Sequence, residues 1–196
     1  MSPLEAHQAA LRACARCPAM IGPVVVGRPV ASRVYLLGQA PGPKEGGLGR
    51  PFAWTAGRQL FKWFATIGLD EARFRERVYM AAVCRCFPGK ARSGGGDRVP
   101  DRDEIAACRP WIDAELALLA PTLVIPVGRL AIDQLLPPAP LVDTIGRSYR
   151  RDGRDVIPLP HPSGASTWFR TEPGRTRTEE ALARIAEHPA WRAIQD

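Results

Sequence analysis

The sequence predicts an α/β fold, a three-layer α/β/α sandwich with a central four-stranded, mainly parallel sheet. Short apolar runs of strand length alternate along the chain with amphipathic segments of helical periodicity, the order typical of a parallel sheet covered by helices on both faces. Apolar residues make up 45% of the 196 residues, enough for one complete core. We therefore expect residues 1–196 to form a single domain.

The chain begins with a predicted helix over residues 4–14, which ends at a C-x-x-C pair formed by Cys14 and Cys17. Pro18 closes the helix. A redox dithiol is one interpretation of such a pair, but redox pairs usually open a helix after a strand, whereas this pair follows a helix. Metal ligation is therefore the favoured interpretation. Residues 23–33 are rich in proline and glycine and lead across the surface to the first strand.

The first half of the predicted sheet surrounds a glycine-rich loop. Residues 34–37 form the first apolar strand, and the loop follows it as Gly38-Gln39-Ala40-Pro41-Gly42. An amphipathic helix is expected over about residues 56–67. Residues 78–83 have the length and β-branched content of a second buried strand. A strand, a glycine loop and a helix in this order typically build a ligand site, although a tight connection alone would also need small residues.

A basic surface loop is predicted over residues 89–100, because its run of glycines and charged residues cannot build a core. Its cationic residues are Lys90, Arg92 and Arg98. Asp101 or Asp103 then caps a long helix, which carries Cys108 and stops at Pro121.

The second half of the sheet comes from two further apolar runs. Residues 122–127 form the third predicted strand, followed by a short helix that ends at Leu136. Residues 137–155 are proline-rich and then polar, and we expect no strand in them. The fourth predicted strand covers residues 156–159, and a final helix covers residues 178–186.

Charge and cysteine content limit the function classes. Lys and Arg outnumber Asp and Glu by 27 to 20, a net charge of +7, which favours a nucleic-acid partner over simple solubility. We find no long apolar span and no signal peptide, so we expect a soluble, cytoplasmic protein with no membrane partner. Five cysteines in such a setting do not predict disulfides. A C-x-x-C pair with two distant cysteines instead predicts an iron–sulfur or zinc site.

Two polar loops follow strand ends and should face each other. One covers residues 39–52 and the other residues 161–169. Because the carboxyl ends of parallel strands meet at one edge of a sheet, the two loops are expected to form opposite walls of one cleft. His161 stands between two prolines at the strand end, a position that favours function over a buried structural histidine.

These features together resemble the uracil-DNA glycosylase superfamily, most closely its iron–sulfur class, often called family four. The resemblance rests on the glycine loop, on Gly49-Arg50-Pro51-Phe52, on four cysteines and on His161-Pro162-Ser163, in the same order over almost the whole chain. It implies a monomeric enzyme that removes uracil from DNA in base-excision repair, with other deaminated bases as further candidates. It also implies a [4Fe–4S] cluster held by Cys14, Cys17, Cys86 and Cys108. Cys84 remains an alternative to Cys86 as the third ligand.

The resemblance also assigns the site. Catalytic candidates are His161, as donor to a base carbonyl, together with Gln39 and Glu45. Substrate-binding candidates are Gly38, Ala40, Pro41, Gly42, Phe52, Ala82 and Ser163. On the loop after His161, which resembles the loop that the superfamily inserts into the duplex, the DNA-binding candidates are Ser166, Trp168 and Arg170. The charge of the basic loop adds Lys90, Arg92 and Arg98 as further DNA-binding candidates. Phe52 would stack on the flipped base, unless it is a core residue, and Trp168 or Phe169 would enter the duplex, unless it anchors its loop.

Three positions depart from the family-four pattern. Gln39 and Gly46 replace acidic residues, and Ala82 replaces an asparagine that reads the uracil edge. Two mechanisms are open at these positions. In one, His161 lowers the barrier to cleavage of the glycosidic bond mainly by stabilising the departing base. In the other, Glu45 orients the attacking water. Loss of the asparagine amide predicts weaker rejection of hypoxanthine and xanthine. A lesion-binding protein with little turnover is the alternative function, and a structural iron–sulfur protein of another nucleic-acid complex is a third.

Overall fold

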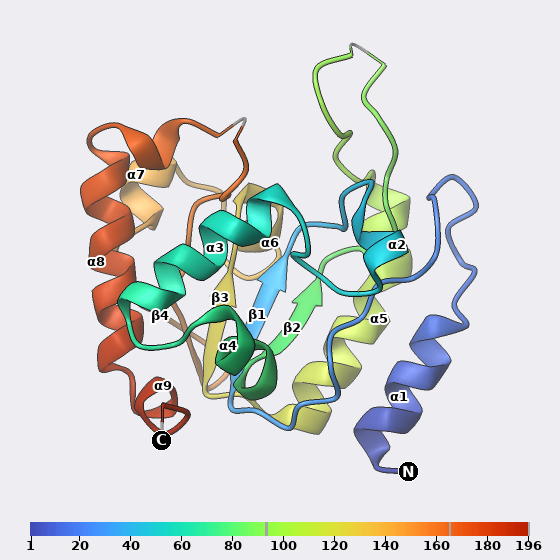
Figure 1. Ribbon diagram of the computed structural model, residues 1–196, viewed down its shortest axis with the longest axis horizontal. Coiled ribbons are helices and arrows are strands. Elements are labelled where there is room, and N and C mark those ends of the chain that lie inside the picture. The colour runs from blue at the N-terminus through green and yellow to red at the C-terminus, as the bar shows by residue number, and fades with distance from the viewer. Residues whose placement is uncertain (93, 165, 196) are drawn as a thin grey trace.

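The computed structural model describes residues 1–196 except Ser93, Ala165 and Asp196, and shows an α/β fold around one sheet (Figure 1). The sheet has five strands in the order β2-β1-β3-β5-β4. The strands are β1 (Val34–Gly38), β2 (Tyr79–Ala82), β3 (Leu123–Pro126), β4 (Tyr149–Arg151) and β5 (Arg154–Val156). Only the β4–β5 pair among them is antiparallel. The α/β class and the mainly parallel sheet are confirmed, whereas the predicted number of four strands is wrong.

The strand missing from the prediction is β4, which lies at the edge of the sheet. It forms a hairpin with β5 through Asp152 and Gly153, whose φ angles of 47° and 75° are those of a two-residue turn with both central residues left-handed. Asp-Gly is the preferred sequence for that turn. Because β4 is largely solvated, its residues carry no apolar run by which a strand would be predicted.

The strand predicted over residues 156–159 begins earlier, at Arg154, and regular pairing ends at Val156. Pro158 and Pro160 have no backbone N–H groups, so they interrupt the ladder. Parallel bonding nevertheless continues, since the N–H of Leu159 donates to the carbonyl of Pro126 at 2.9 Å. The end of this interrupted strand therefore still delivers the following residues to the carboxyl edge of the sheet.

The helices cover the two faces of the sheet as expected. α3 (Thr55–Thr66) and α4 (Glu71–Arg77) cross in front of it in Figure 1, and α1 (Pro3–Arg12) lies beside α5 (Arg102–Leu119). The remaining helices are α2 (Glu45–Leu48), α6 (Arg129–Asp133), α7 (Leu141–Thr144), η1 (Trp168–Arg170), α8 (Gly174–Glu187) and α9 (Pro189–Arg192). The predicted helices over 4–14 and 56–67 are confirmed to within two residues at each end. The last long helix, α8, starts four residues earlier than predicted.

The long helix α5 follows from its sequence. Asp101 accepts the backbone N–H of Glu104, and the Glu104 carboxylate accepts the N–H of Asp101, each at 2.9 Å, which forms a capping box. This settles Asp101 rather than Asp103 as the cap. Cys108 and Ile112 lie on the buried side of this helix. Among the described helices, none is both long enough and apolar enough to cross a membrane.

The topology places a crevice at the carboxyl edge of the sheet. β1 is central and pairs with β2 on one side and β3 on the other, so the chain reverses its direction of winding there. Open α/β sheets bind ligands at such a switch point. The glycine loop leaves β1 at this edge, Gly128 follows β3, and His161 follows β5 and its extension.

Candidate active site

A cavity of about 430 Å³ lies at this edge, and the two predicted loops meet around it. The predicted residues that line it are Gly38, Gln39, Ala40, Pro41, Gly42, Glu45, Phe52, Ala82, Lys90, Arg98, His161 and Ser163. Its volume is in the range of small-molecule sites. The parallel sheet therefore brings these residues together as expected, from positions up to 125 apart in the sequence.

Glu45 holds the glycine loop in shape. Its Oε2 accepts the backbone N–H of Gly42 at 3.1 Å, and its Oε1 accepts that of Ala53 at 3.0 Å. The residue is only 7% exposed. Burial raises the pKa of Glu45, and the two backbone N–H groups oppose that rise. The predicted catalytic residue Glu45 thus lies beneath the loop as a clamp between its two ends.

The other candidate in the loop, Gln39, is partly exposed at the cavity wall. The backbone carbonyl of Gln39 accepts a hydrogen bond from the backbone N–H of Cys84 at 3.1 Å. The backbone carbonyl of the preceding Gly38 accepts one from the N–H of Val83 at 2.9 Å. The pairing of β1 with β2 is therefore continued past the strand ends. It fixes the start of the glycine loop to the segment that carries Cys84 and Cys86.

Phe52 lies against the start of the glycine loop. It has a left-handed backbone with φ 53°, and the carbonyls of Pro51 and Phe52 accept hydrogen bonds from Arg75 at 2.9 and 3.0 Å. A Cβ on Gly38 would stand 2.9 Å from the Phe52 ring, and one on Gly57 would stand 1.8 Å from its carbonyl oxygen. Both positions therefore require glycine. The ring is half-buried and lines the cavity, so it is both packed against the core and open to a ligand.

His161 lines the opposite wall as a neutral imidazole. Its Nδ1 accepts the backbone N–H of Ser163 at 3.2 Å, which leaves the ring proton on Nε2. Burial lowers the pKa of His161 and so favours the uncharged ring. Gly128, with φ 86°, lies under the ring, where a Cβ would come within 2.9 Å of its Cδ2 atom. The arrangement presents an N–H donor at the carboxyl edge of the sheet.

Residues 89–92 and 94–98 form the two sides of a hairpin that stands above this edge in Figure 1. Lys90 pairs with Asp97 in the ladder, and their side chains form an ion pair of 2.6 Å. At the base, Arg98 donates to Glu104 of α5 at 2.7 Å, which lowers the pKa of that carboxyl group. Arg92 is exposed further out. The predicted surface loop thus has regular pairing, and two of its three cations are held by acidic partners.

The predicted DNA loop after His161 packs outside the cavity. Phe169 is 8% exposed and meets the Trp63 ring edge-on at a centroid distance of 5.0 Å. Trp168 is half-buried over Gly174. Of the two candidate wedges, Phe169 is therefore an anchor. Among the described residues, the cavity lining does not include Ser166, Trp168, Arg170 or Arg92. Ala165, also in this loop, lies outside the described residues.

The cysteines gather at a second cavity, of about 330 Å³. Cys14, Cys17, Cys86 and Cys108 all line it. Cys84 does not, and it is fully buried with its thiol against Cys108. Burial raises the pKa of Cys17 to about 11, whereas the hydrogen bond from Cys84 lowers that of Cys108 to about 6. Within the described part of the chain, no three Cys, His, Asp or Glu residues are close enough to hold a single metal ion.

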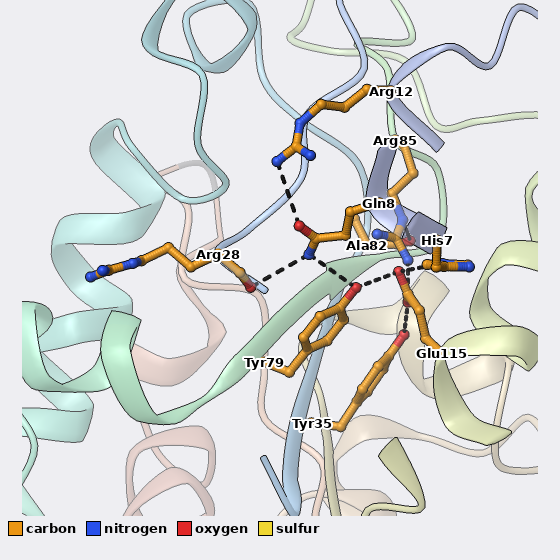
Figure 2. Close-up of polar contacts among 9 residues, drawn as sticks. All are labelled: His7, Gln8, Arg12, Arg28, Tyr35, Tyr79, Ala82, Arg85 and Glu115. Carbon is orange, nitrogen blue, oxygen red and sulfur yellow. Dashed lines mark hydrogen bonds and ion pairs between the residues drawn. The ribbon is translucent and has the colours of Figure 1, made fainter. Parts of the chain in front are cut away.

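A buried polar network joins the two cavities and was not predicted (Figure 2). Glu115 of α5 accepts hydrogen bonds from Tyr35 at 2.6 Å, Tyr79 at 2.8 Å and Arg85 at 2.6 Å. Arg85 also donates from Nε to the carbonyl of Ala82 at 2.8 Å, beside the active-site cavity. The contacts connect α5, the neighbouring strands β1 and β2 and the loop that carries the cysteines.

The N-terminal helix α1 reaches the same network. Gln8 lies 3.4 Å from the Tyr79 hydroxyl, and His7 Nε2 lies 3.5 Å from Glu115 without hydrogen-bond geometry (Figure 2). In a sequence, an ionisable residue on the otherwise apolar face of a predicted helix indicates such a buried network. Glu115, next to the buried Leu116, is one. Its partners could not be identified from the sequence because they are 30 to 80 positions away.

Among the lining residues that sequence reasoning missed are one tryptophan and one carboxylate. Trp54 is 52% exposed at the start of α3, and Asp97 lies on the hairpin. In the sequence, Asp97 is one polar residue of a predicted surface loop. Trp54 is an aromatic residue before a predicted helix. Only the folded hairpin and the turn at Phe52 bring them to the cavity.

Comparison with known proteins identifies the family. Residues 24–186 match the Uracil DNA glycosylase superfamily. The Type-4 uracil-DNA glycosylase of Thermotoga maritima is 30% identical over 159 residues, which cover 78% of each chain. That of Sulfurisphaera tokodaii is 29% identical over 144 residues, 68% of this chain and 61% of the relative, so this chain spans less than two thirds of it. The Type-5 uracil-DNA glycosylase of Thermus thermophilus is 31% identical over 164 residues, 67% of this chain and 71% of the relative. Because the family match covers most of the sequence, this chain belongs to the uracil-DNA glycosylase superfamily.

Proposed function

We propose that the protein is a DNA glycosylase that hydrolyses the bond between uracil and deoxyribose in DNA, as the first step of base-excision repair. The observation that carries the proposal is His161, a neutral imidazole with its proton on Nε2, facing the glycine loop across one cavity. Bond cleavage leaves negative charge on the base and positive charge on the sugar. A fixed N–H donor at a base carbonyl stabilises the first of these charges.

The cavity suits a base that has left the duplex. A flipped base is bound by stacking and by hydrogen bonds to its edge. The half-buried ring of Phe52 supplies a stacking surface, and the compact loop held by Glu45 supplies backbone N–H groups near a helix start. The base would lie between Phe52 and His161, with its glycosidic bond toward the open side.

Stabilisation of the departing base is the favoured mechanism. Glu45, the other candidate, is 7% exposed and uses both carboxylate oxygens for backbone N–H groups. The Glu45 carboxylate therefore has little room left to accept a hydrogen bond from an attacking water. Gln39 cannot accept a proton as a carboxylate does. Donation from His161 therefore accounts for most of the barrier reduction in this proposal.

The proposal extends to other deaminated bases. Ala82 lies at the cavity with its side chain almost fully buried, where its methyl group offers no amide to read a base edge. A site rejects a wrong ligand strongly when that ligand leaves buried polar groups of the site unpaired. Without such a group at residue 82, hypoxanthine and xanthine are expected to be accepted more readily than by relatives with an amide there.

We propose further that Cys14, Cys17, Cys86 and Cys108 hold a [4Fe–4S] cluster. These four thiols line one cavity. Four thiols around a larger group are the donor set of an iron–sulfur cluster. When bound, the cluster would supply a cross-link between the segment after α1, the loop after β2 and α5. Cys84, away from this cavity, would remain a buried thiol.

DNA would approach the edge that carries the cavity and the hairpin. The net charge of +7 favours binding to phosphates, and Arg92 is an exposed cation on the hairpin. Ser166, Trp168 and Arg170 lie on the loop that follows His161, at the start of the path to α8. We propose that the protein acts as a monomer in contact with DNA through these two segments.

One assay tests the function. The full-length protein is incubated with a uracil-containing oligonucleotide, the product is treated with alkali, and strand scission is measured. We expect scission with the unchanged protein, a loss of ~100-fold or more with His161→Ala, and no change with His188→Asn, which keeps a capping side chain far from the cavity.

The same experiment separates the alternative function. A lesion-binding protein is favoured by one observation, the engagement of Glu45 in backbone hydrogen bonds. Such a protein would retard the uracil oligonucleotide in a gel and leave it uncut. Scission products with uracil and not with thymine would exclude that alternative, as well as a purely structural iron–sulfur protein.

A further inference from the structure

A carboxylate is missing from the mechanism proposed above, and the cavity offers few. Of the described residues that line it, two are acidic: Glu45 and Asp97. A water molecule that attacks a sugar is activated most readily by a carboxylate within hydrogen-bond reach. The identity of that group can therefore be argued from the surroundings of two side chains.

Glu45 is unsuited to the role. Its two oxygens accept the N–H groups of Gly42 and Ala53, and 93% of the residue's surface is covered, since only 7% is exposed. Moving it toward a water would release both ends of the glycine loop. Burial also raises its pKa, which disfavours the ionised form that a base needs.

Among the described residues, the Oδ1 atom of Asp97 has a hydrogen-bond partner and its Oδ2 atom has none. Its Oδ1 accepts a hydrogen bond from Lys90 Nζ at 2.6 Å, which fixes the side chain on the hairpin. Its Oδ2 lies 3.8 Å from the point where a Cβ on Gly42 would stand, so it lies close to the glycine loop at the cavity wall. The side chain is 36% exposed, which leaves room for a water molecule beside it.

The structure also explains how a hairpin residue reaches this position. The backbone N–H of Arg98 donates to the carbonyl of Gly89 at 3.0 Å, and Arg98 is tied to Glu104 of α5. The base of the hairpin is thereby fixed to a long helix. Asp97 is the residue directly before this fixed point, so its location does not depend on the hairpin tip.

We propose that Asp97 binds and orients the attacking water, a role that rests on the glycosylase function proposed above. As the bond from C1′ to the base breaks, its electron pair leaves with the base, whose carbonyl is stabilised by the Nε2–H group of His161. The water oxygen forms a bond to C1′, and one water proton passes to the Asp97 carboxylate and then to solvent. The departing base takes a proton from solvent, so the products are the free base and a sugar with a hydroxyl at C1′.

The proposal accounts for two departures in the sequence. Gln39 and Gly46 stand where acidic residues are found in the family-four pattern, Gln39 on the glycine loop and Gly46 in α2 directly after it. A carboxylate supplied from the hairpin makes an acid at those two positions unnecessary. It also assigns a function to the basic hairpin before α5 beyond contact with phosphates.

The test is Asp97→Asn in the full-length protein with its natural complement of iron. The amide keeps an oxygen for Lys90, so the hairpin contact is retained while the base is removed. Under single-turnover conditions with a uracil oligonucleotide, we expect the cleavage rate to fall ~100-fold or more. DNA affinity and the thermal midpoint should stay unchanged, and Asp97→Glu should regain part of the rate.

Asp152→Asn is the matched control, because it removes one negative charge from a hairpin turn far from the cavity and Asn tolerates the same left-handed backbone. If Asp97→Asn cleaves within threefold of the unchanged protein while His161→Ala does not, the role of Asp97 is refuted and the glycosylase function stands. If the unchanged protein binds uracil-DNA without cleaving it, the glycosylase function fails, and the role of Asp97 fails with it. A lower thermal midpoint together with weaker DNA binding in Asp97→Asn would refute the role as well, by assigning Asp97 to structure.

Discussion

Replacing Glu115 by glutamine should be among the most destabilising single changes that preserve side-chain shape. Glu115 is fully buried and accepts hydrogen bonds from Tyr35, Tyr79 and Arg85. Glutamine keeps the size and one carbonyl oxygen but removes the charge. The Arg85 guanidinium, itself 2% exposed, would then be buried without a counter-charge.

Two independent routes give the magnitude. Loss of one partner from a buried ion pair typically costs ~3–5 kcal/mol. Burial opposes the ionisation of Glu115, but the charge of Arg85 and the hydrogen bonds to the carboxylate together outweigh it and lower the pKa from its ordinary 4.5 to about 2. One pKa unit corresponds to ~1.4 kcal/mol, so the lowering of the Glu115 pKa from 4.5 to about 2 corresponds to about 3 kcal/mol. We therefore expect Glu115→Gln to lower the free energy of unfolding by about 3 kcal/mol.

Urea unfolding followed by tryptophan fluorescence measures this loss, with protein preparations matched for iron content. With a slope of ~2 kcal/mol per molar urea, the midpoint should fall by roughly 1.5 M. The control is Glu76→Gln, which breaks an exposed pair with Arg28 and should move the midpoint by less than ~0.3 M.

The pH dependence gives a second check. The pKa of Glu115 is lower in the folded protein than in the unfolded chain, so its stabilisation is present above pH ~4.5 and is lost as the pH falls toward about 2. The difference between the unchanged protein and Glu115→Gln should shrink over that window. A midpoint change below ~0.5 M at pH 7, or a difference that stays constant down to pH 2, would refute the reasoning.

Three further predictions concern the cleft. Gly128→Ala places a methyl group 2.9 Å from the His161 ring and should slow cleavage at least ~10-fold, whereas Gly153→Ala, with a similar φ but open space, should leave the cleavage rate unchanged. Because burial lowers the pKa of His161, the single-turnover rate should stay constant as the pH falls from 8 through 6.5, and an acid limb centred at or above 6.5 would contradict this. Arg92→Gln should reduce the slope of log affinity against log salt by about 1, and an unchanged slope would exclude Arg92 from the phosphate contacts.

The sheet centre and the cleft could be predicted because their signals are local. β1, β2 and β3 are fully buried and therefore read as continuous apolar runs. In a parallel sheet the loops after such strands must share an edge, which was enough to place His161 opposite the glycine loop. The edge strand β4 lacked this signal because its side chains face solvent, although its Asp-Gly turn was visible in the sequence.

The contacts that decide the chemistry could not be predicted, because they join distant segments. Glu45 appeared as a free carboxylate in the sequence, and only the fold shows that Gly42 and Ala53 occupy both of its oxygens. Asp97 appeared as part of a surface loop, and only the pairing of the hairpin brings it to the cavity. Burial and hydrogen-bond partners are tertiary properties, so the residue type alone does not assign such roles.

The measurement that tests the central claim most directly is the release of free base from uracil-containing DNA by the unchanged protein and by His161→Ala. The account predicts that the unchanged protein releases uracil and leaves an alkali-labile site, and that His161→Ala is slower by ~100-fold or more while binding the same DNA. Release of uracil by His161→Ala at a rate near that of the unchanged protein would contradict the central role of the neutral imidazole.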